Sequence, residues 1–225
     1  LKAHGMKKNL YPSLLLIVLL HACGLPKTSI QTHPKEVEEL ASKSKASYEA
    51  AQLAKNKEEI LIKTQEGLSY AEACLKKEKN QLDCLYYQAL NRGLLTKNHI
   101  RGYQDSLKLM VKSCSQVLEI KEDYSFAGCH RFLGNLYAKA PRLSLQKEAV
   151  TRDMDKALYH LKRAVELAPD YALNQLFYAR TLFKAGELEK AKVALHHFET
   201  LLSPSLDKDY PEWKKEYTQL REDLS

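Results

Sequence analysis

The fold is decided by residues 154–191, MDKALYHLKRAVELAPDYALNQLFYARTLFKAGELEKA. Ala157 and Leu161 are spaced four residues apart, so they share one face of a helix. Pro169 and Gly186 lie where this helix and the next one end, and both residue types are typical of helix boundaries. The stretch therefore predicts consecutive helices joined by tight turns.

The rest of the chain shows the same helical character. The 225 residues include only 8 glycines and 7 prolines, and no run alternates between polar and apolar residues as a strand would. We therefore predict an all-α domain over residues 34–225, with about nine helices and mostly short connections. The expected helices span residues 35–55, 58–78, 83–96, 101–120, 125–139, 152–167, 171–185, 187–202 and 211–224.

An internal repeat indicates how these helices are organised. Asp123-Tyr124 recurs as Asp170-Tyr171 at an offset of 47 residues. Leu133-Gly134-x-x-Tyr137 resembles the first-helix signature of tetratricopeptide repeats, and Ala157-x-x-x-Leu161 resembles the second-helix signature. Gly134 and Ala157 are expected where two helices cross at close range. The resemblance implies a superhelix of tetratricopeptide-like hairpins; a generic α-hairpin bundle is the alternative.

One connection is too long for a repeat of this kind. Residues 141–151, PRLSLQKEAVT, separate the two signature helices and combine basic with apolar residues. Such an insertion is expected to project from one face of the stack. We predict that Leu143 and Leu145 contact a partner. The alternative, that the segment packs onto its own hairpin, stays open at this point.

The N-terminal residues indicate where the protein is located. Residues 1–5 precede Met6 and are expected to be a tag or an over-called start. Residues 6–22 have two lysines followed by a short apolar run, which is typical of a secretory signal. They lead into Leu20-His21-Ala22-Cys23, which resembles a bacterial lipobox, although His21 departs from the usual pattern. An ordinary signal peptide with a chance cysteine is the alternative.

The lipobox resemblance implies cleavage before Cys23, lipidation of its sulfur, and a lipidated linker over residues 23–33. Several acyl chains would hold the protein stably at a membrane. The residue after Cys23 is glycine rather than aspartate, which favours sorting to the outer membrane. We therefore expect a lipid-anchored protein on the periplasmic face of a bacterial envelope.

Charge and motif content exclude several functions. The net charge is +7, but residues 1–22 hold three lysines and no acidic residue, so the remaining chain carries only +4. Lysine and glutamate are interleaved, without the basic stripe and aromatics typical of nucleic-acid binding. The chain has no H-E-x-x-H, G-x-S-x-G, Walker or C-x-x-C motif. We predict no enzyme activity, cofactor, metal site or nucleic-acid partner.

Four cysteines remain if Cys23 carries lipid. Cys74 and Cys84 flank one predicted turn, and Cys114 and Cys129 flank another. In an oxidising compartment each pair is a candidate disulfide, which would contribute about 2–3 kcal/mol for loops this short. The alternative is that all four are buried thiols.

Aromatic and polar residues gather in first-helix positions, which line the concave face of a tetratricopeptide stack. Such side chains suit a groove for a peptide or an apolar ligand. The alternative is that most of them are core residues. The candidate ligand- or partner-binding residues, including the two leucines of the insertion, are Tyr86, Tyr87, Asn91, His130, Arg131, Asn135, Leu143, Leu145, Asn174 and Phe177.

A more specific resemblance covers roughly residues 58–202. DCLYYQALNRGLL at 83–95, AGCHRFLGNLYAKAPRLS at 127–144 and the stretch 154–191 resemble the T-component family of periplasmic TRAP-type transporters. The resemblance implies a lipid-anchored, non-enzymatic helical protein. It also implies association with the P-component, the solute-binding protein of the transporter. A homo-oligomeric ring, such as a trimer, and a cavity for a hydrophobic ligand are implied as well.

The leading hypothesis is an accessory lipoprotein of a TRAP-type solute-uptake system. The alternative is a general tetratricopeptide scaffold or pilotin lipoprotein for envelope assembly. A lipoprotein hydrolase is a third possibility, against which the missing nucleophile motifs count.

Overall fold

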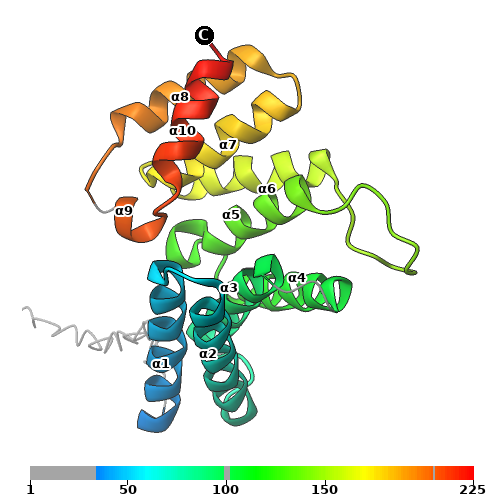
Figure 1. Cartoon of the computed structure of the whole chain (residues 1–225), viewed down its shortest axis with the longest axis vertical. Helices are drawn as coiled ribbons and strands as arrows, with labels where there is room; N and C mark the ends of the chain where they lie inside the picture. Colours follow the sequence, from blue (N-terminus) through cyan, green and yellow to red (C-terminus); the bar gives the residue numbers. More distant parts are fainter. Residues whose placement is uncertain (1–33, 99–101, 205) are drawn as a thin grey trace, which may run out of the picture. The chain divides into compact units, whose positions relative to one another are not determined.

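Helices form every regular element in the part of the chain that the computed structural model describes, residues 34–98, 102–204 and 206–225. Their bounds are α1 (Lys35–Leu53), α2 (Lys57–Lys77), α3 (Leu82–Asn98), α4 (Tyr103–Ile120), α5 (Tyr124–Lys139), α6 (Met154–Leu167), α7 (Ala172–Lys184), α8 (Leu188–Thr200), α9 (Leu206–Asp209) and α10 (Trp213–Asp223) (Figure 1). The predicted all-α fold with about nine helices is confirmed. The four-residue α9 was not expected. The predicted signal peptide, Cys23 and the linker lie outside the described residues.

Local sequence explains where several helices begin and end. The Asn56 side chain accepts a hydrogen bond from the Glu59 backbone N–H at 2.9 Å, and Asp153 accepts one from Lys156 at the same distance. Such N-caps satisfy donors that the first turn of a helix leaves free. Gly186, with φ +81°, ends the turn after α7 in the left-handed region that glycine adopts without strain.

Consecutive helices pack against one another within the unit His33–Ser225. The closest partners are α1 with α2, α2 with α3, α3 with α4, α5 with α6, and α7 with α8, while α1 also contacts α3 and α5 also contacts α7 (Figure 1). Contacts between neighbours and next neighbours are typical of a stack of helical hairpins.

The contact between α5 and α6 depends on small side chains, as expected. We call Gly134, Ala157 and Leu161 the α5–α6 joint. A methyl group on Gly134 would overlap the Leu161 side chain and would lie 3.1 Å from the Ala157 carbonyl oxygen. Ala157 and Leu161 are fully buried. At this joint the two helices therefore approach closely through apolar contacts.

The contact among α1, α2 and α3 is polar instead. We call Ser44, Gly67 and Asn91 the α1–α3 joint. The Ser44 hydroxyl donates to the Gly67 carbonyl at 2.8 Å, and the Asn91 amide donates to the carbonyls of Ser44 (3.2 Å) and Tyr87 (2.9 Å). A disulfide between Cys74 and Cys84, with Cα atoms 6.3 Å apart, covalently links α2 to α3 near this joint.

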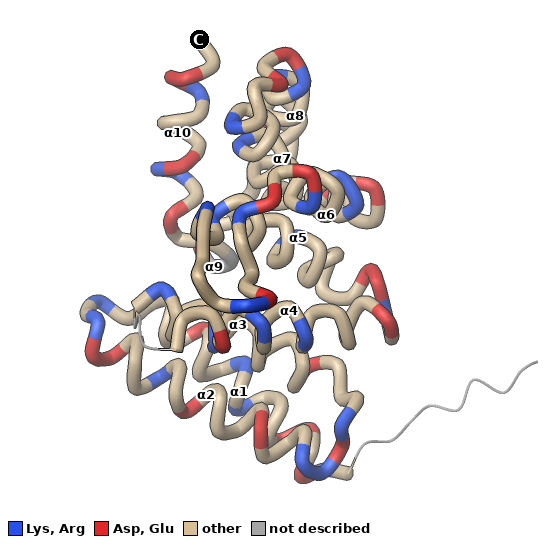
Figure 2. Tube along the Cα trace, turned by 90° about the vertical axis from the view of Figure 1, so that its right-hand side faces the viewer, with Lys and Arg blue, Asp and Glu red and all other residues tan. Residues whose placement is uncertain are grey.

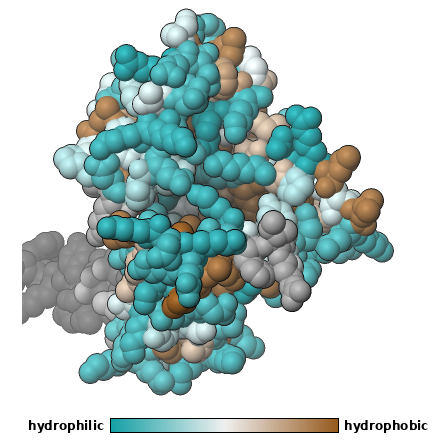
Figure 3. Space-filling view, viewed as in Figure 1, coloured by the Kyte–Doolittle hydropathy of each residue, from teal (hydrophilic) through white to brown (hydrophobic). Residues whose placement is uncertain are grey.

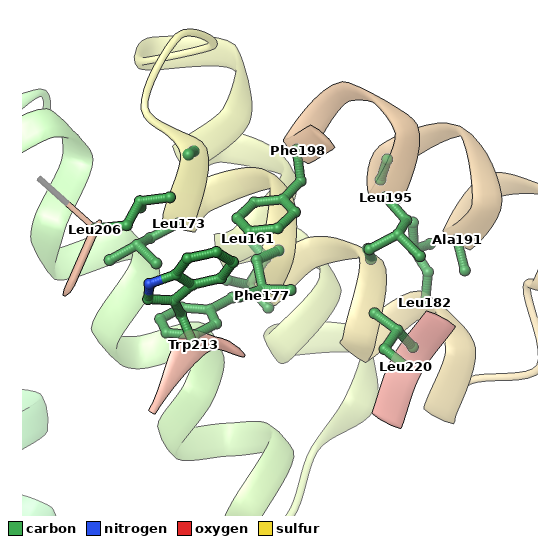
Figure 4. Packing of buried hydrophobic residues seen from close by; sticks show 14 residues of the cluster. Leu161, Leu173, Phe177, Leu182, Ala191, Leu195, Phe198, Leu206, Trp213 and Leu220 are labelled. Carbon is green, nitrogen blue, oxygen red and sulfur yellow. The ribbon is translucent and has the colours of Figure 1, made fainter. Parts of the chain in front are cut away.

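A well-filled apolar cluster holds α7, α8 and α10 together. Figure 4 shows Trp213 beside Phe198 and Phe177, with Leu206 at one end and Leu220 at the other. The Trp213 and Phe198 rings meet edge to face, with centroids 5.7 Å apart. This cluster fixes the C-terminal helix against the preceding hairpin.

The insertion between α5 and α6 is irregular and projects away from the helices (Figure 1). Its base is closed by a hydrogen bond from the Arg152 N–H to the Pro141 carbonyl at 2.8 Å, and the Val150 backbone pairs with the Gln104 side chain of α4. At its tip Leu143 is 88% exposed and Leu145 is 107% exposed. The segment contacts α4 at Val150 and through the Lys147 carbonyl, which accepts from Lys108 at 3.3 Å, and hydrophobic residues reach solvent at its tip (Figure 3).

Charged residues are interleaved on the helices rather than gathered into one patch. Figure 2 shows basic and acidic positions alternating along α1 and α2, and local ion pairs such as Lys43–Glu39 (2.7 Å) connect them. Among the described residues, no helix combines the length and apolar character that crossing a membrane requires.

Candidate functional site

A cavity of about 520 Å³ opens between the N-terminal helices and α5. This volume lies within the range of small-molecule sites, about 300–1,000 Å³. Its walls come from α1, α3, α4, α5 and α7 and from the connection between α9 and α10. The aromatic residues in its wall include Tyr48, Tyr86, Tyr87, Phe132, Tyr171 and Phe177.

Three tyrosines form the side of the cavity nearest α1 and α3. The ring of Tyr87 lies 6.0 Å from that of Tyr48 and 5.3 Å from that of Tyr86. Burial raises the pKa of both Tyr48 and Tyr86, so their hydroxyls stay neutral at any physiological pH. Gly128 lies against the Tyr86 hydroxyl, where any larger residue would collide with it. This wall presents ring faces together with neutral hydroxyl groups.

The part of the wall next to Tyr86 begins with an unusual backbone turn. Ser125, Phe126 and Ala127 have φ values of +53°, +57° and +56°, in the left-handed region that residues other than glycine seldom adopt. The Phe126 carbonyl accepts hydrogen bonds from Arg131 at 3.0 Å and from the Asn174 amide at 3.3 Å. The Phe126 ring stacks on Tyr171 with centroids 4.9 Å apart. The turn therefore orients groups that hold Arg131.

Arg131 is a cation in the cavity wall without a carboxylate partner among the described residues. Its Nη1 donates to the Phe126 carbonyl at 3.0 Å and to the Asn174 side-chain oxygen at 2.9 Å, and both acceptors are neutral. The guanidinium lies 4.5 Å from the centre of the Tyr171 ring. These contacts hold the side chain in place but leave its charge uncompensated.

The other cations in the wall are paired. Lys97 meets Glu212 at 3.2 Å, and Lys139 meets Glu216 at 3.5 Å. Burial, and then the nearby Arg180 charge, lowers the pKa of Lys139 to about 8. Glu216 also pairs with Arg180, and the Tyr210 hydroxyl donates to it at 2.9 Å. Carboxylates of the C-terminal segment therefore neutralise the positive charges at this end of the cavity.

The structure brings half of the predicted candidates together. Those that line the cavity are Tyr86, Tyr87, Arg131, Asn135 and Phe177. Asn135 is already engaged, because its amide nitrogen donates to the Arg131 carbonyl at 2.9 Å and its oxygen accepts from Arg180. Leu143 and Leu145 lie at the tip of the insertion, away from the cavity wall.

The interpretation of Asn91, His130 and Asn174 as ligand contacts needs correction. All three are buried, and none lines the cavity. Asn91 belongs to the α1–α3 joint. The Asn174 amide donates to the carbonyls of Ala164 and Ala168, both at 3.0 Å, and so closes the end of α6. Their donor groups bond partners inside the fold rather than facing open space, while the Asn91 Oδ1 is buried without a hydrogen-bond partner among the described residues.

His130 belongs to a polar cluster that sequence reasoning missed. Its Nε2 lies 3.0 Å from Glu122, and its Nδ1 lies 2.9 Å from Nδ1 of His160. Arg163 donates two hydrogen bonds to Glu122, at 2.7 and 2.8 Å. Arg163 is the main reason that the pKa of Glu122 falls to about 2, and burial lowers the pKa of His160 to about 4. No sequence spacing indicated this cluster, since its members meet only once α5 and α6 pack.

The remaining two candidate cysteines stay as thiols. Cys114 and Cys129 are free and buried, in α4 and α5. Burial, reinforced by a hydrogen bond with Cys129, raises the pKa of Cys114. Across the described ranges, no group of three or more His, Cys, Asp or Glu side chains is placed to hold a metal ion.

Paired helices, small residues at their crossings and a cavity between hairpins define a helical-repeat protein. A family model described as "Tetratricopeptide repeat" matches residues 151–197. A crystal structure of a thermophilic TPR protein from Thermus thermophilus is similar, with a TM-score of 0.60 and 18% sequence identity over 84% of this chain and 83% of that one. No curated protein matches. The chain is therefore a tetratricopeptide-like, all-α superhelical protein.

Proposed function

We propose that this protein is a non-enzymatic accessory component of a TRAP-type solute-uptake system, anchored by lipid on the periplasmic face of the envelope. It would dock the solute-binding protein of that system and hold an apolar ligand in its cavity. The observation that carries the proposal is the aromatic cavity of about 520 Å³ within a tetratricopeptide-like stack. A scaffold that only binds proteins does not need an internal cavity with ring-lined walls.

The anchoring part of the proposal rests on the sequence before the folded unit. The lipobox-like residues Leu20 to Cys23 follow a basic and apolar segment. A lipid on Cys23 would tether the helical domain through a ten-residue stretch, residues 24–33. Intact-mass analysis of the membrane fraction tests this part. An acylated Cys23 that disappears in Cys23→Ala supports it, and an unmodified Cys23 in native membranes contradicts it.

The docking part rests on the projecting insertion. Leu143 and Leu145 are exposed, whereas the base of the segment is tied to α4 by the Gln104–Val150 pair. Exposed leucines on a segment whose base is fixed offer an apolar contact with little ordering cost on binding. Arg142 and Lys147 beside them favour an acidic surface on the partner.

Purification from native membranes in mild detergent, with mass spectrometry of the associated proteins, tests the docking part. A TRAP-type solute-binding protein is the expected partner, and recovery of an envelope-assembly machine instead would favour the scaffold or pilotin alternative. The double variant Leu143→Ser with Leu145→Ser should reduce the amount of partner recovered while the helical content stays unchanged. The matched control is Leu188→Ser with Val193→Ser, which removes two exposed apolar residues from α8.

Native mass spectrometry of the same purified sample measures the number of copies in the homo-oligomeric ring that the family resemblance implies.

A further inference from the structure

The cavity wall holds one cation whose charge nothing in the described chain compensates. Arg131 donates only through Nη1, to a backbone carbonyl and a side-chain amide oxygen. Its Nε and Nη2 groups have no hydrogen-bond partner among the described residues, and neither is a buried atom lacking a partner. These donors therefore face accessible space.

The contrast with the neighbouring cations makes this arrangement specific. Lys97 and Lys139 each have a carboxylate within 3.5 Å, but Arg131 has none within ion-pairing distance in the described residues. Glu49 also lines the cavity, yet it forms no ion pair with Arg131. The charge of Arg131 instead acts on the neutral hydroxyls of Tyr48 and Tyr86, whose pKa values it partly lowers against the effect of burial.

An uncompensated guanidinium in an aromatic wall suits one kind of ligand. Two free N–H groups on one guanidinium match the two oxygens of a carboxylate, and charge-assisted hydrogen bonds are the stronger ones. Apart from polar residues such as Lys97 and Lys139, the wall contains aromatic rings and apolar side chains, such as Phe132 and Met110, which suit a flat apolar body. The arrangement is already fixed, because Phe126, Asn174 and Tyr171 hold the side chain.

We propose that the cavity binds a monocarboxylate with an apolar or aromatic body, and that Arg131 receives the carboxylate. This inference rests on the proposed function, since it names the chemical class of the ligand in the same cavity. It also distinguishes Arg131 from Asn135 and Lys139, which line the cavity but are engaged within the protein.

The test compares ligands that differ only in charge. Calorimetric titration of the purified full chain would use 3-(2-naphthyl)propionate, its primary amide and the corresponding alcohol. We expect the carboxylate to bind at least tenfold more tightly than either neutral analogue. Equal affinities would overturn the inference about Arg131 while leaving an apolar-ligand cavity in place. If none of the three binds, both this inference and the ligand part of the proposed function fail.

Binding measurements on variants of the cavity wall test the role of Arg131 independently. Arg131→Gln should reduce carboxylate affinity to that of the amide, and Arg131→Lys should restore only part of the preference because a lysine lacks the two-pronged geometry. Lys139→Gln is the matched control, since its ammonium is already paired with Glu216, and it should keep the tenfold preference. A preference that survives in Arg131→Gln with unchanged helical content contradicts the proposal. The ligand comparison needs no variant, so it decides the matter even if Arg131→Gln folds poorly.

Discussion

The α1–α3 joint and the α5–α6 joint both bring helices close together, but with different chemistry. At the α5–α6 joint, Gly134 faces Leu161 and the contact is apolar. At the α1–α3 joint, Gly67 faces the Asn91 amide, and hydrogen bonds replace aliphatic packing. Of these two described joints, only the polar one has a disulfide beside it. The comparison teaches that glycine supplies the close approach in both places, while the residue opposite decides how the contact is stabilised.

The largest effect is expected from filling the apolar joint. Gly134→Leu or Ala157→Leu should lower the free energy of unfolding by about 3 kcal/mol, because Gly134 already faces Leu161 and the Ala157 carbonyl at close range and Ala157 is fully buried. Urea unfolding followed by circular dichroism measures this change. Ala46→Leu, at an exposed position of α1, is the control and should change stability little. Unchanged midpoints for both joint variants would contradict the assigned helix crossing.

The next largest effect on stability is expected from removing the disulfide between α2 and α3. Cys74 and Cys84 are 10 residues apart in the sequence. Removing their bond by Cys74→Ala with Cys84→Ala should lower stability by about 2–3 kcal/mol, because the unfolded chain regains freedom. A reductant should destabilise the wild type and leave the double variant unaffected. A wild type whose melting temperature does not respond to reductant would argue against the role of this bond.

Acidification should affect the α5–α6 contact more than the α1–α3 joint. His160 has a folded-state pKa of about 4, below its ordinary value of 6.5, so the unfolded chain binds its proton first. Stability from this group is present above pH 6.5 and is lost as the pH falls towards 4, by about 1–2 kcal/mol. Glu122, with its pKa lowered to about 2, adds a further loss as the pH falls below 4.5.

Chemical unfolding between about pH 7 and about pH 4.5 measures this loss. His160→Gln should reduce the slope, since glutamine does not titrate in this range, and should leave the part due to His130, whose pKa burial also lowers. Ser44, Gly67 and Asn91 contain no titrating side chain, so Asn91→Ala should keep the wild-type slope. A slope that is the same in His160→Gln and in the wild type would contradict the assignment to His160.

The smallest expected effect is a coupling within the polar joint. Gly67→Ala places a methyl group against the Asn91 amide and should destabilise the protein, whereas the same change in an Asn91→Ala background should be tolerated better. We expect a coupling energy of about 1 kcal/mol from this double-mutant cycle. Additive effects would show that the two residues do not share the contact.

The apolar joint could be predicted from the sequence and the polar joint could not, for a physical reason. Gly134, Ala157 and Leu161 fit the helical period of a repeat hairpin, and small residues at that spacing are typical of a close helix crossing. Asn91 lies at a position equally compatible with a cavity wall. Its role depends on Ser44, which is 47 residues away. Whether a polar residue on a helix faces a cavity or a neighbouring helix can therefore be decided only when its hydrogen-bond partner is known.

The cavity could be predicted in outline but not in its electrostatics. Tyrosine-rich first helices indicated an aromatic surface, and Tyr86, Tyr87 and Phe177 do line the cavity. The difference between Arg131 and Lys139 depends on Glu216, which belongs to α10 far along the chain. The short α9 was not expected, so the contribution of the connection after it to the wall was also missed.

The connection between α9 and α10 has a consequence for how the cavity can vary. Tyr210 and Glu212 form part of its wall, although neither belongs to a repeat hairpin. Substitutions at Glu212, whose exposed side chain pairs with Lys97, would alter the charge of the wall without touching either of the two helix joints. Part of the ligand preference can therefore change between related chains without a change at the helix joints, because this part of the wall lies outside them.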